Sequence, residues 1–374
     1  MTMRRAALWT LLIAKAIAGI GVGWDIRWHI TIGRDTFWIA PHIMTYSGVA
    51  IVAMVSFGVL AYETWAARGG RLSADSFRTA GLVGTRGFHL AWWGIAITIL
   101  AAPIDDLWHR LFGIDVTLWS PPHLLCLAGA QINSIGCLFI ACELWPRGRT
   151  REIALGVGGL LLFSGFQTGV DPALRTAFNH GGVRFFTFAM LGGLFFAFSL
   201  VLTARLSAAR LMPLVVVVAG VLLHLSVIVI GDIGMAVLRP EPAIAEAIAA
   251  DPGSPIAVAH EIARRNGVAP GRGYMVRLFP LLPALALALL DARRRAIAGG
   301  VAFGLVIYMV NAVMLMRSPA FSHVHPDGMD ALAGVVLAVI ASLVGTTAAV
   351  VFERRLIDDG AAARIAPSPA SARA

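Results

Sequence analysis

The chain has 374 residues, of which 58% are hydrophobic and 14% are charged, and its mean hydropathy is +0.79. Soluble domains are about half apolar and about a quarter charged, so this composition excludes an ordinary soluble enzyme or nucleic-acid-binding protein. The formal net charge of +9 is therefore not evidence for a nucleic-acid partner.

Apolar segments of about 20 residues, the length that crosses a bilayer as a helix, recur along the whole chain. Because backbone groups in lipid must be hydrogen-bonded within their own segment, we predict an all-α polytopic integral membrane protein. The ten predicted spans are residues 6–24, 39–65, 87–104, 122–145, 153–169, 183–204, 212–238, 275–292, 296–316 and 330–352.

The charges of the connections predict the orientation. With the N-terminus in the cytoplasm, the inner segments hold 18 arginines and 8 acidic residues, whereas the outer segments hold 11 arginines and 13 acidic residues. Basic residues favour the cytoplasmic side, so we predict an inner-membrane protein with both termini in the cytoplasm. The long outer connection, 239–274, is expected to contain a surface helix from Pro242 to Asn266, broken near Pro252. Lys15, deep in the first span, is expected to pair with a carboxylate such as Asp232.

Two similar segments lie at the outer ends of the first and second pairs of spans. Residues 25–42 read DIRWHITIGRDTFWIAPH, and residues 105–123 read DDLWHRLFGIDVTLWSPPH. With one inserted residue they share Asp25/Asp105, Trp28/Trp108, His29/His109, Gly33/Gly113, Asp35/Asp115, Trp38/Trp119, Pro41/Pro122 and His42/His123. Chance would give about one such identity, so the pattern predicts an internal parallel duplication of a two-helix unit.

The repeat also predicts how the chain is organised. Residues 1–146 form a duplicated four-helix region with repeats at about 6–65 and 87–145, and residues 147–356 form a further six-helix region. Residues 357–374 are expected to be a disordered cytoplasmic tail, because they are rich in Ala, Pro, Ser and Arg.

Each copy offers one carboxylate and two imidazoles. An aspartate and a histidine four residues apart share a helix face, and the second histidine follows a proline that suits a helix start. Two imidazoles and a carboxylate can hold copper, zinc or non-haem iron. The predicted metal ligands are Asp25, His29 and His42 in the first copy and Asp105, His109 and His123 in the second. The alternative is an interfacial belt of aromatic and polar residues, which two matching copies make less favoured.

Other polar residues on the outer side are candidates for supporting roles. We expect Arg34, Asp35 and Asp115 to orient the histidine ligands through hydrogen bonds. His323 and His325 precede the last span and are a further candidate pair of metal ligands, although ordinary loop polarity also accounts for them.

The first motif resembles that of the C subunit of particulate methane and ammonia monooxygenases, the copper membrane monooxygenases. That subunit has a D-x-x-W-H-x-T-I-x-R-D-T segment and an Asp-x3-His-x12-His set of copper ligands, and Asp25, His29 and His42 keep this spacing. Pro41 directly precedes His42, whereas the family has Pro-Ser-His. The resemblance covers about residues 25–145, less than half of the chain.

The second motif resembles the second candidate copper site of the same family. That site is formed by Asn, His and His, with one extra residue between the histidines, and Asp105, His109 and His123 match the spacing with Asp in place of Asn. The resemblance implies copper as cofactor, although the donor set also suits zinc and iron.

Two functions follow from these residues. The resemblance implies a copper-binding oxygenase component that acts on a small apolar substrate within the bilayer, as a homo-oligomer or with partner membrane subunits. The alternative is a transporter or metal-handling protein with metal sites on its outer face. A zinc-dependent intramembrane hydrolase is less favoured, because the chain lacks an H-E-x-x-H motif.

Overall fold

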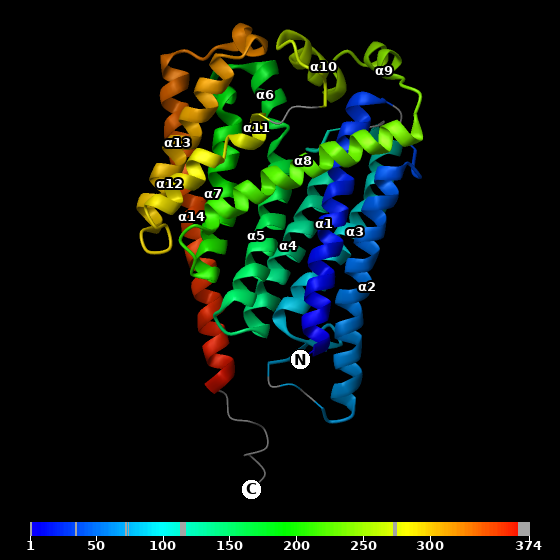
Figure 1. The fold of residues 1–374 in the computed structure, drawn as a ribbon, viewed down its shortest axis with the longest axis vertical. Helices are drawn as coiled ribbons and strands as arrows, with labels where there is room; N and C mark the ends of the chain where they lie inside the picture. Colours follow the sequence, from blue (N-terminus) through cyan, green and yellow to red (C-terminus); the bar gives the residue numbers. More distant parts are fainter. Residues whose placement is uncertain are drawn as a thin grey trace.

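The computed structural model describes residues 2–33, 36–71, 73, 75–112, 117–271 and 275–365, with the backbone alone for residue 109 and residues 356–365. These residues form a bundle of long helices (Figure 1). The bundle helices are α1 (Thr2–Thr31), α2 (Ala40–Arg68), α3 (Arg86–Phe112), α4 (Pro121–Leu144), α5 (Arg149–Val170), α7 (Thr187–Ser207), α8 (Met212–Leu238), α13 (Ala296–Met316) and α14 (Gly328–Ile365).

Shorter elements join these helices. They are α6 (Ala173–His180), α9 (Ile244–Ala250), α10 (Pro255–Arg265), α11 (Met275–Leu278), α12 (Leu281–Leu289), the 3-10 turns η1 (Gly182–Phe186) and η2 (Pro319–Val324), and the strands β1 (Phe77–Thr79) and β2 (Leu82–Gly84). The two strands form an antiparallel hairpin in which Phe77 pairs with Gly84. Ala80 and Gly81 both have positive φ there, as a tight two-residue hairpin turn requires.

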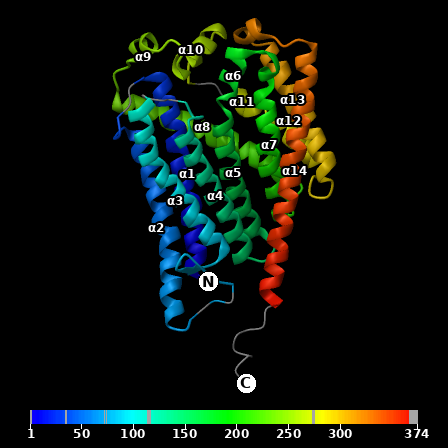
Figure 2. The ribbon, with the colours of Figure 1, turned by 180° about the vertical axis from the view of Figure 1, so that it is seen from behind.

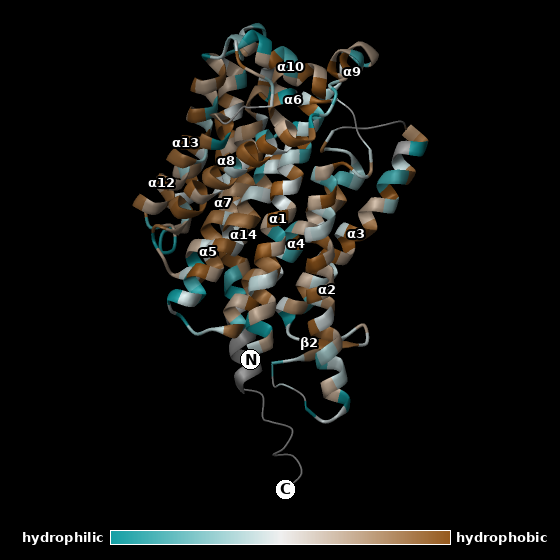
Figure 3. Cartoon of the chain, turned by 45° about the vertical axis from the view of Figure 1, so that its right-hand side comes forward, coloured by the Kyte–Doolittle hydropathy of each residue, from teal (hydrophilic) through white to brown (hydrophobic). Residues whose placement is uncertain are grey.

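The predicted all-α polytopic membrane fold is confirmed. In the described part of the chain, nine helical segments are long and apolar enough to cross a bilayer. Apolar residues cover the middle of the bundle, and hydrophilic residues gather toward its two ends (Figure 3). The helices extend beyond the apolar segments that predicted them: α1 continues from residue 24 to Thr31, and α14 continues to Ile365. Residues 357–365 of the predicted disordered tail are therefore helical, and the rest of that tail lies outside the described residues.

The eighth predicted span, 275–292, is wrong as a single helix. The chain forms α11 and then α12, interrupted at Phe279 and Pro280. A proline lacks the N–H that a continuous helix needs, and its ring clashes with the preceding turn. At 1.5 Å per residue, residues 275–289 reach only about 22 Å, less than the roughly 30 Å of a bilayer's hydrocarbon core.

The broken segment still reverses the direction of the chain. The N-terminal end of α1 and the C-terminal end of α14 lie at the same end of the bundle, whereas α9 and α10 cover the opposite end (Figures 1 and 2). From this opposite end, α11 and α12 run back into the bundle before α13 returns. Among the described residues, nine long helices and the shorter α11–α12 segment therefore leave the start of α1 and the end of α14 at the same end of the bundle.

The connection 239–274 has the broken helix that its sequence predicts between Pro242 and Asn266. Its two parts are α9 and α10, separated by a turn at Pro252 and Gly253. Ser254 begins α10, where its hydroxyl oxygen accepts a hydrogen bond from the Ala257 N–H at 3.1 Å. Such a cap satisfies one of the N–H groups that the first turn of a helix leaves unbonded.

One connected hydrophobic core crosses the predicted boundary at residue 146. It includes Leu8 of α1, Leu138 of α4, Leu162 of α5, Phe196 of α7 and Phe303 of α13, all of which are almost fully buried. Helix α8 lies obliquely across one face of this bundle (Figure 1) and packs against α1, α5, α7 and α12. The two predicted regions are thus packed as one unit.

The two helix pairs that carry the similar segments have matching helix contacts. A methyl group added to Gly48 of α2 would lie 2.6 Å from the Ala14 carbonyl oxygen and 2.8 Å from the Ala18 nitrogen of α1. A methyl group added to Gly129 of α4 would lie 2.6 Å from the carbonyl oxygen of residue 94 and 2.7 Å from the nitrogen of residue 98 in α3. These contact positions are offset by 80 or 81 residues, as in the aligned motifs. Small residues of this kind let helix backbones approach closely in membranes.

Replacing Gly48 with leucine should therefore push α1 and α2 apart. We expect the free energy of unfolding to fall by about 1–3 kcal/mol, the usual range for an overpacked contact. Gly58 on the same helix is the control, because a methyl group there would have no heavy atom within 4 Å. Thermal unfolding in detergent should show a lower midpoint for Gly48→Leu and no loss for Gly58→Leu. Equal midpoints for the two variants would contradict the close contact.

Candidate functional site

The first predicted cluster lies where α1 ends and α2 begins. Asp25 and His29 are one turn apart near the C-terminal end of α1, and His42 is in the first turn of α2. Ile39 is the N-cap of α2, and Pro41 occupies the first turn, where its missing N–H leaves no bond unmade. The helix pair therefore brings the three predicted ligands together at the end of the bundle opposite the chain termini (Figure 1).

The Asp25 carboxylate lies between the two imidazoles. Its Oδ1 atom is 3.1 Å from His42 Nε2 and 3.5 Å from His29 Nδ1. The three side chains are 24%, 17% and 19% exposed for Asp25, His42 and His29, so the cluster is largely shielded but open to one side. His29 Nδ1 also donates a hydrogen bond to the Asp25 carbonyl oxygen at 2.9 Å. Since a carbonyl only accepts, this bond puts the proton on Nδ1 and the lone pair on Nε2.

The atom types of the cluster suit a divalent transition metal, and some of the distances between them do as well. Donors bound to one tetrahedral metal at about 2.0–2.2 Å lie roughly 3.3 Å apart, close to the 3.1 Å between Asp25 Oδ1 and His42 Nε2. The 3.5 Å distance to His29 is to the protonated Nδ1, so His29 would have to bind a metal through Nε2. The centres of the two imidazole rings, however, are 6.3 Å apart. Within the described residues, no three His, Cys, Asp or Glu side chains are already placed to hold one metal ion. Binding one ion by Asp25, His29 and His42 therefore requires the imidazoles to come closer together.

The second predicted cluster is partly described. Asp105 Oδ1 on α3 is 3.5 Å from His123 Nε2 on α4, and His123 Nδ1 donates to the Thr117 carbonyl oxygen at 2.7 Å. Because Nδ1 is the donor, neutral His123 turns the lone pair of Nε2 toward the carboxylate, an arrangement that suits a cation between them. The side chain of His109 lies outside the described residues.

The predicted supporting residues have different outcomes. Arg34, Asp35 and Asp115 all lie outside the described residues. Both ring nitrogens of His323 are already hydrogen-bonded. Nδ1 accepts from Arg265 at 2.9 Å, and Nε2 donates to the Phe178 carbonyl at 3.1 Å. A metal ion at His323 would have to displace one of these bonds. His325 is exposed, with its ring edge toward Phe185.

Helix α8 supports the first cluster in a way that sequence reasoning missed. Arg27 is buried on α1 and donates to Asp232 Oδ1 at 2.6 Å and to the Ile228 carbonyl at 2.7 Å, both on α8. Gly231 and Gly234 make room for this contact: a methyl group on Gly231 would lie 2.7 Å from the Arg27 guanidinium, and one on Gly234 would lie 2.2 Å from the Trp24 ring. The sequence signal was the spacing of these two glycines around Asp232.

The pairing predicted for Lys15 is therefore wrong. Asp232 bonds to Arg27, and Lys15 Nζ donates instead to the Ala130 carbonyl oxygen of α4 at 3.1 Å. Arg27 is the better partner because it lies at the height in the bundle where α8 places Asp232. Lys15 lies more than three helical turns closer to the N-terminus of α1.

The connection 239–274 packs over the last turn of α1. His260 Nε2 donates to the Ile30 carbonyl at 2.7 Å, and the Ala243 N–H donates to the Ile32 carbonyl at 2.7 Å. These bonds satisfy carbonyl groups that a helix C-terminus otherwise leaves unbonded. Within α10, hydrogen bonds from Arg264 and Arg265 lower the pKa of the Glu261 carboxyl to about 2. The connection is thus anchored beside the first cluster.

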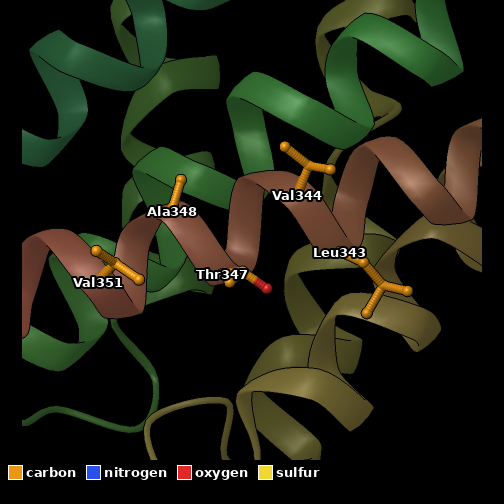
Figure 4. Close-up of a pocket in the computed structure, with 5 residues that line it drawn as sticks. All are labelled: Leu343, Val344, Thr347, Ala348 and Val351. Carbon is orange, nitrogen blue, oxygen red and sulfur yellow. The ribbon is translucent and has the colours of Figure 1, made fainter.

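A shallow hollow on α14 is a poor candidate site. It is lined by Leu343, Val344, Thr347, Ala348 and Val351 on one helix (Figure 4). Apart from the threonine hydroxyl the lining is apolar, and none of these side chains can serve as an acid, a base or a good metal ligand. Such a surface is typical of a helix that faces lipid.

Comparison of the chain with known proteins adds no relative. No protein-family model matches it, and neither the curated proteins nor the solved structures gave a match. The functional argument therefore depends on the residues themselves and on the resemblance of the two motifs.

The Arg27–Asp232 pair predicts a large effect of removing one charge. Asp232→Asn leaves the buried Arg27 guanidinium without its carboxylate. A fully buried pair loses about 3–5 kcal/mol of unfolding free energy in such a change, and we expect a smaller loss here because the Asp232 side chain is 38% exposed. Replacing both residues with leucine should restore part of the loss. The control is Arg264→Leu, which breaks an exposed ion pair on α10. Thermal unfolding in detergent measures all three, and an Asp232→Asn midpoint equal to that of the control would contradict the buried pair.

Proposed function

We propose that this chain is a copper-binding integral membrane protein, related to the C subunits of the copper membrane monooxygenases. The observation that carries the proposal is the grouping of Asp25, His29 and His42 at two adjacent helix ends, with Asp25 Oδ1 3.1 Å from His42 Nε2 and 3.5 Å from the His29 ring. Charged and polar side chains near lipid are costly and commonly functional. Divalent copper has the highest affinity in its series for imidazole and carboxylate ligands.

The duplication is part of the proposal. The matching contacts of Gly48 and Gly129 with the preceding helices support it. So do Glu63 and Glu143, which stand in the similar segments Glu63-Thr-Trp65 and Glu143-Leu-Trp145 after the second helix of each pair of spans. Glu63 accepts from Arg4 at the start of α1, at 2.6 Å, and Glu143 accepts from Thr85 and the Gly87 N–H at the start of α3, at 2.6 and 2.9 Å. Asp105, His109 and His123 would then form a second, related copper site.

We further propose that the first site serves an oxygenase component for a small apolar substrate. Bound copper would supply the activation of O₂. The residues of the chain would supply the setting: Asp25, His29 and His42 hold the ion at the membrane edge, and Trp24 and Trp28 pack below them as a buried apolar wall. A substrate dissolved in the bilayer could approach the cluster laterally without crossing water.

Metal handling or transport is the second candidate, and one observation favours it. Transporters of known mechanism use interrupted helices and charged residues within the membrane. Helices α11 and α12 form an interrupted helix, and Arg277 of α11 forms an ion pair with Asp171 at the end of α5. In this reading the outer clusters would capture an ion before it enters the bundle.

Copper content tests the proposed site directly. His29→Ala should lower the copper bound by purified, copper-loaded protein by about one ion per chain, because the remaining two ligands hold it weakly. His180→Ala, an exposed histidine of α6, is the matched control and should keep the copper. Elemental analysis measures both, and unimpaired thermal unfolding shows that the variants are folded. Wild-type copper content in His29→Ala would refute the assignment.

Whole-cell oxidation distinguishes the two candidate functions. Oxidation of a small hydrocarbon or of ammonia should fall much more with His42→Ala than with His123→Ala. The reason is that Asp105 adds negative charge where the family has Asn, which favours divalent over monovalent copper and so opposes redox cycling. If copper binds but no copper-dependent oxidation of any apolar substrate is detected, metal handling becomes the better function.

A further inference from the structure

Two turns at the end of the bundle that carries the termini are held together by arginines. One turn joins α7 to α8, and the other joins α12 to α13. Arg210 donates to the Ala288 and Leu289 carbonyl oxygens, both at 2.7 Å, and so bonds the end of α12. Arg293 donates in return to the Ala208 carbonyl. The two turns therefore form one fixed surface with a defined arrangement of guanidinium groups.

This surface carries excess positive charge. Residues 205–211 and 289–297, with Glu353 of α14, contain five arginines and two carboxylates, a net charge of +3. Hydrogen bonds from Arg293 lower the pKa of the Asp291 carboxyl, so this acid is ionised at neutral pH and already engaged. Arg294 is 84% exposed, and Arg295 is exposed beside it. Arg294 Nε lies 3.8 Å from Asp291 Oδ2, but its side chain is mostly exposed, so both guanidinium groups can be reached by a ligand.

Large aliphatic side chains surround the exposed arginines. Leu211, Leu289 and Ile297 are 60%, 64% and 72% exposed. The turn between α12 and α13 also lies further into the bundle than the ends of α5 and α14 on the same side (Figures 1 and 2). Exposed arginine next to exposed leucine and isoleucine is typical of the boundary between acyl chains and headgroups, where each group finds a matching environment.

We propose that Arg294 and Arg295 bind the phosphate headgroup of an anionic phospholipid, in the leaflet on the side of the chain termini, with its acyl chains against Leu211, Leu289 and Ile297. Guanidinium groups bind phosphate oxygens through paired hydrogen bonds. Clusters of basic residues beside membrane helices attract anionic lipids at about 1 kcal/mol per charge. A soluble polyanion would gain nothing from the flanking aliphatic side chains, so a lipid fits both parts of the surface.

Lipid retention by the full chain tests this site. The protein, purified in neutral detergent, is mixed with equal amounts of phosphatidylglycerol and phosphatidylcholine, and bound lipids are counted by native mass spectrometry. Wild type should retain phosphatidylglycerol preferentially. Arg294→Gln with Arg295→Gln should lower that preference on the order of tenfold, because two charges are lost. Arg147→Gln with Arg149→Gln, two exposed arginines between α4 and α5, is the matched control and should keep it.

Two further measurements decide the remaining outcomes. Lysine at both positions should keep most of the preference, which separates loss of charge from misfolding of the glutamine variant. Inorganic phosphate should not displace the lipid, because it lacks the acyl chains. Equal retention of the two lipids by wild type, or an unchanged preference in the glutamine variant, would overturn the proposal. Displacement by phosphate would overturn the proposal that the ligand is a lipid and would indicate a small soluble anion instead.

Discussion

The hydrocarbon core of a bilayer cannot hydrogen-bond to protein, so the charged groups on the spans of this chain need partners within the protein. The partners follow from where each group lies along its helix. Arg27 bonds to α8, Lys15 bonds to a carbonyl of α4, and Arg205 bonds to Glu353 of α14. Each of these bonds joins helices that are distant in sequence. The same constraint that makes every span a helix thus also decides how the helices pack.

Helix α1 shows how this constraint leads to the candidate site. Its C-terminal end is held by Arg27 and Trp24 against α8, and its last carbonyls are bonded by the connection 239–274 through His260 and Ala243. A helix end fixed on two sides can hold Asp25 and His29 in a defined direction toward His42. Binding sites in general need such rigid support, since small displacements of ligands weaken both metal binding and catalysis.

The two copies of the motif differ in what surrounds them. In the first, Trp24, Trp28 and Ile32 are buried, partly by Ile230 and Met235 of α8. In the second, no helix covers the corresponding part of α3 among the described residues, and Leu107, Leu111 and Phe112 are more than half exposed. If the two motifs arose by duplication, the first became surrounded by protein side chains, whereas the second remained at the surface of the bundle. This difference agrees with a functional first site and a diverged second one.

The sequence alone determined the class of fold and the grouping of the first cluster. Apolar segments of bilayer length predict helices because lipid leaves the backbone no other choice, and the spacing of Asp25, His29 and Pro41-His42 places these groups on adjacent helix ends. It did not determine the break at Pro280, because hydropathy averages over a proline. Nor did it reveal that Asp232 bonds to Arg27 rather than Lys15, or that His260 covers Ile30, since these contacts join residues about 200 positions apart. Only the tertiary structure decides such pairs, because they depend on the tilt and height at which helices pack, which local patterns do not encode.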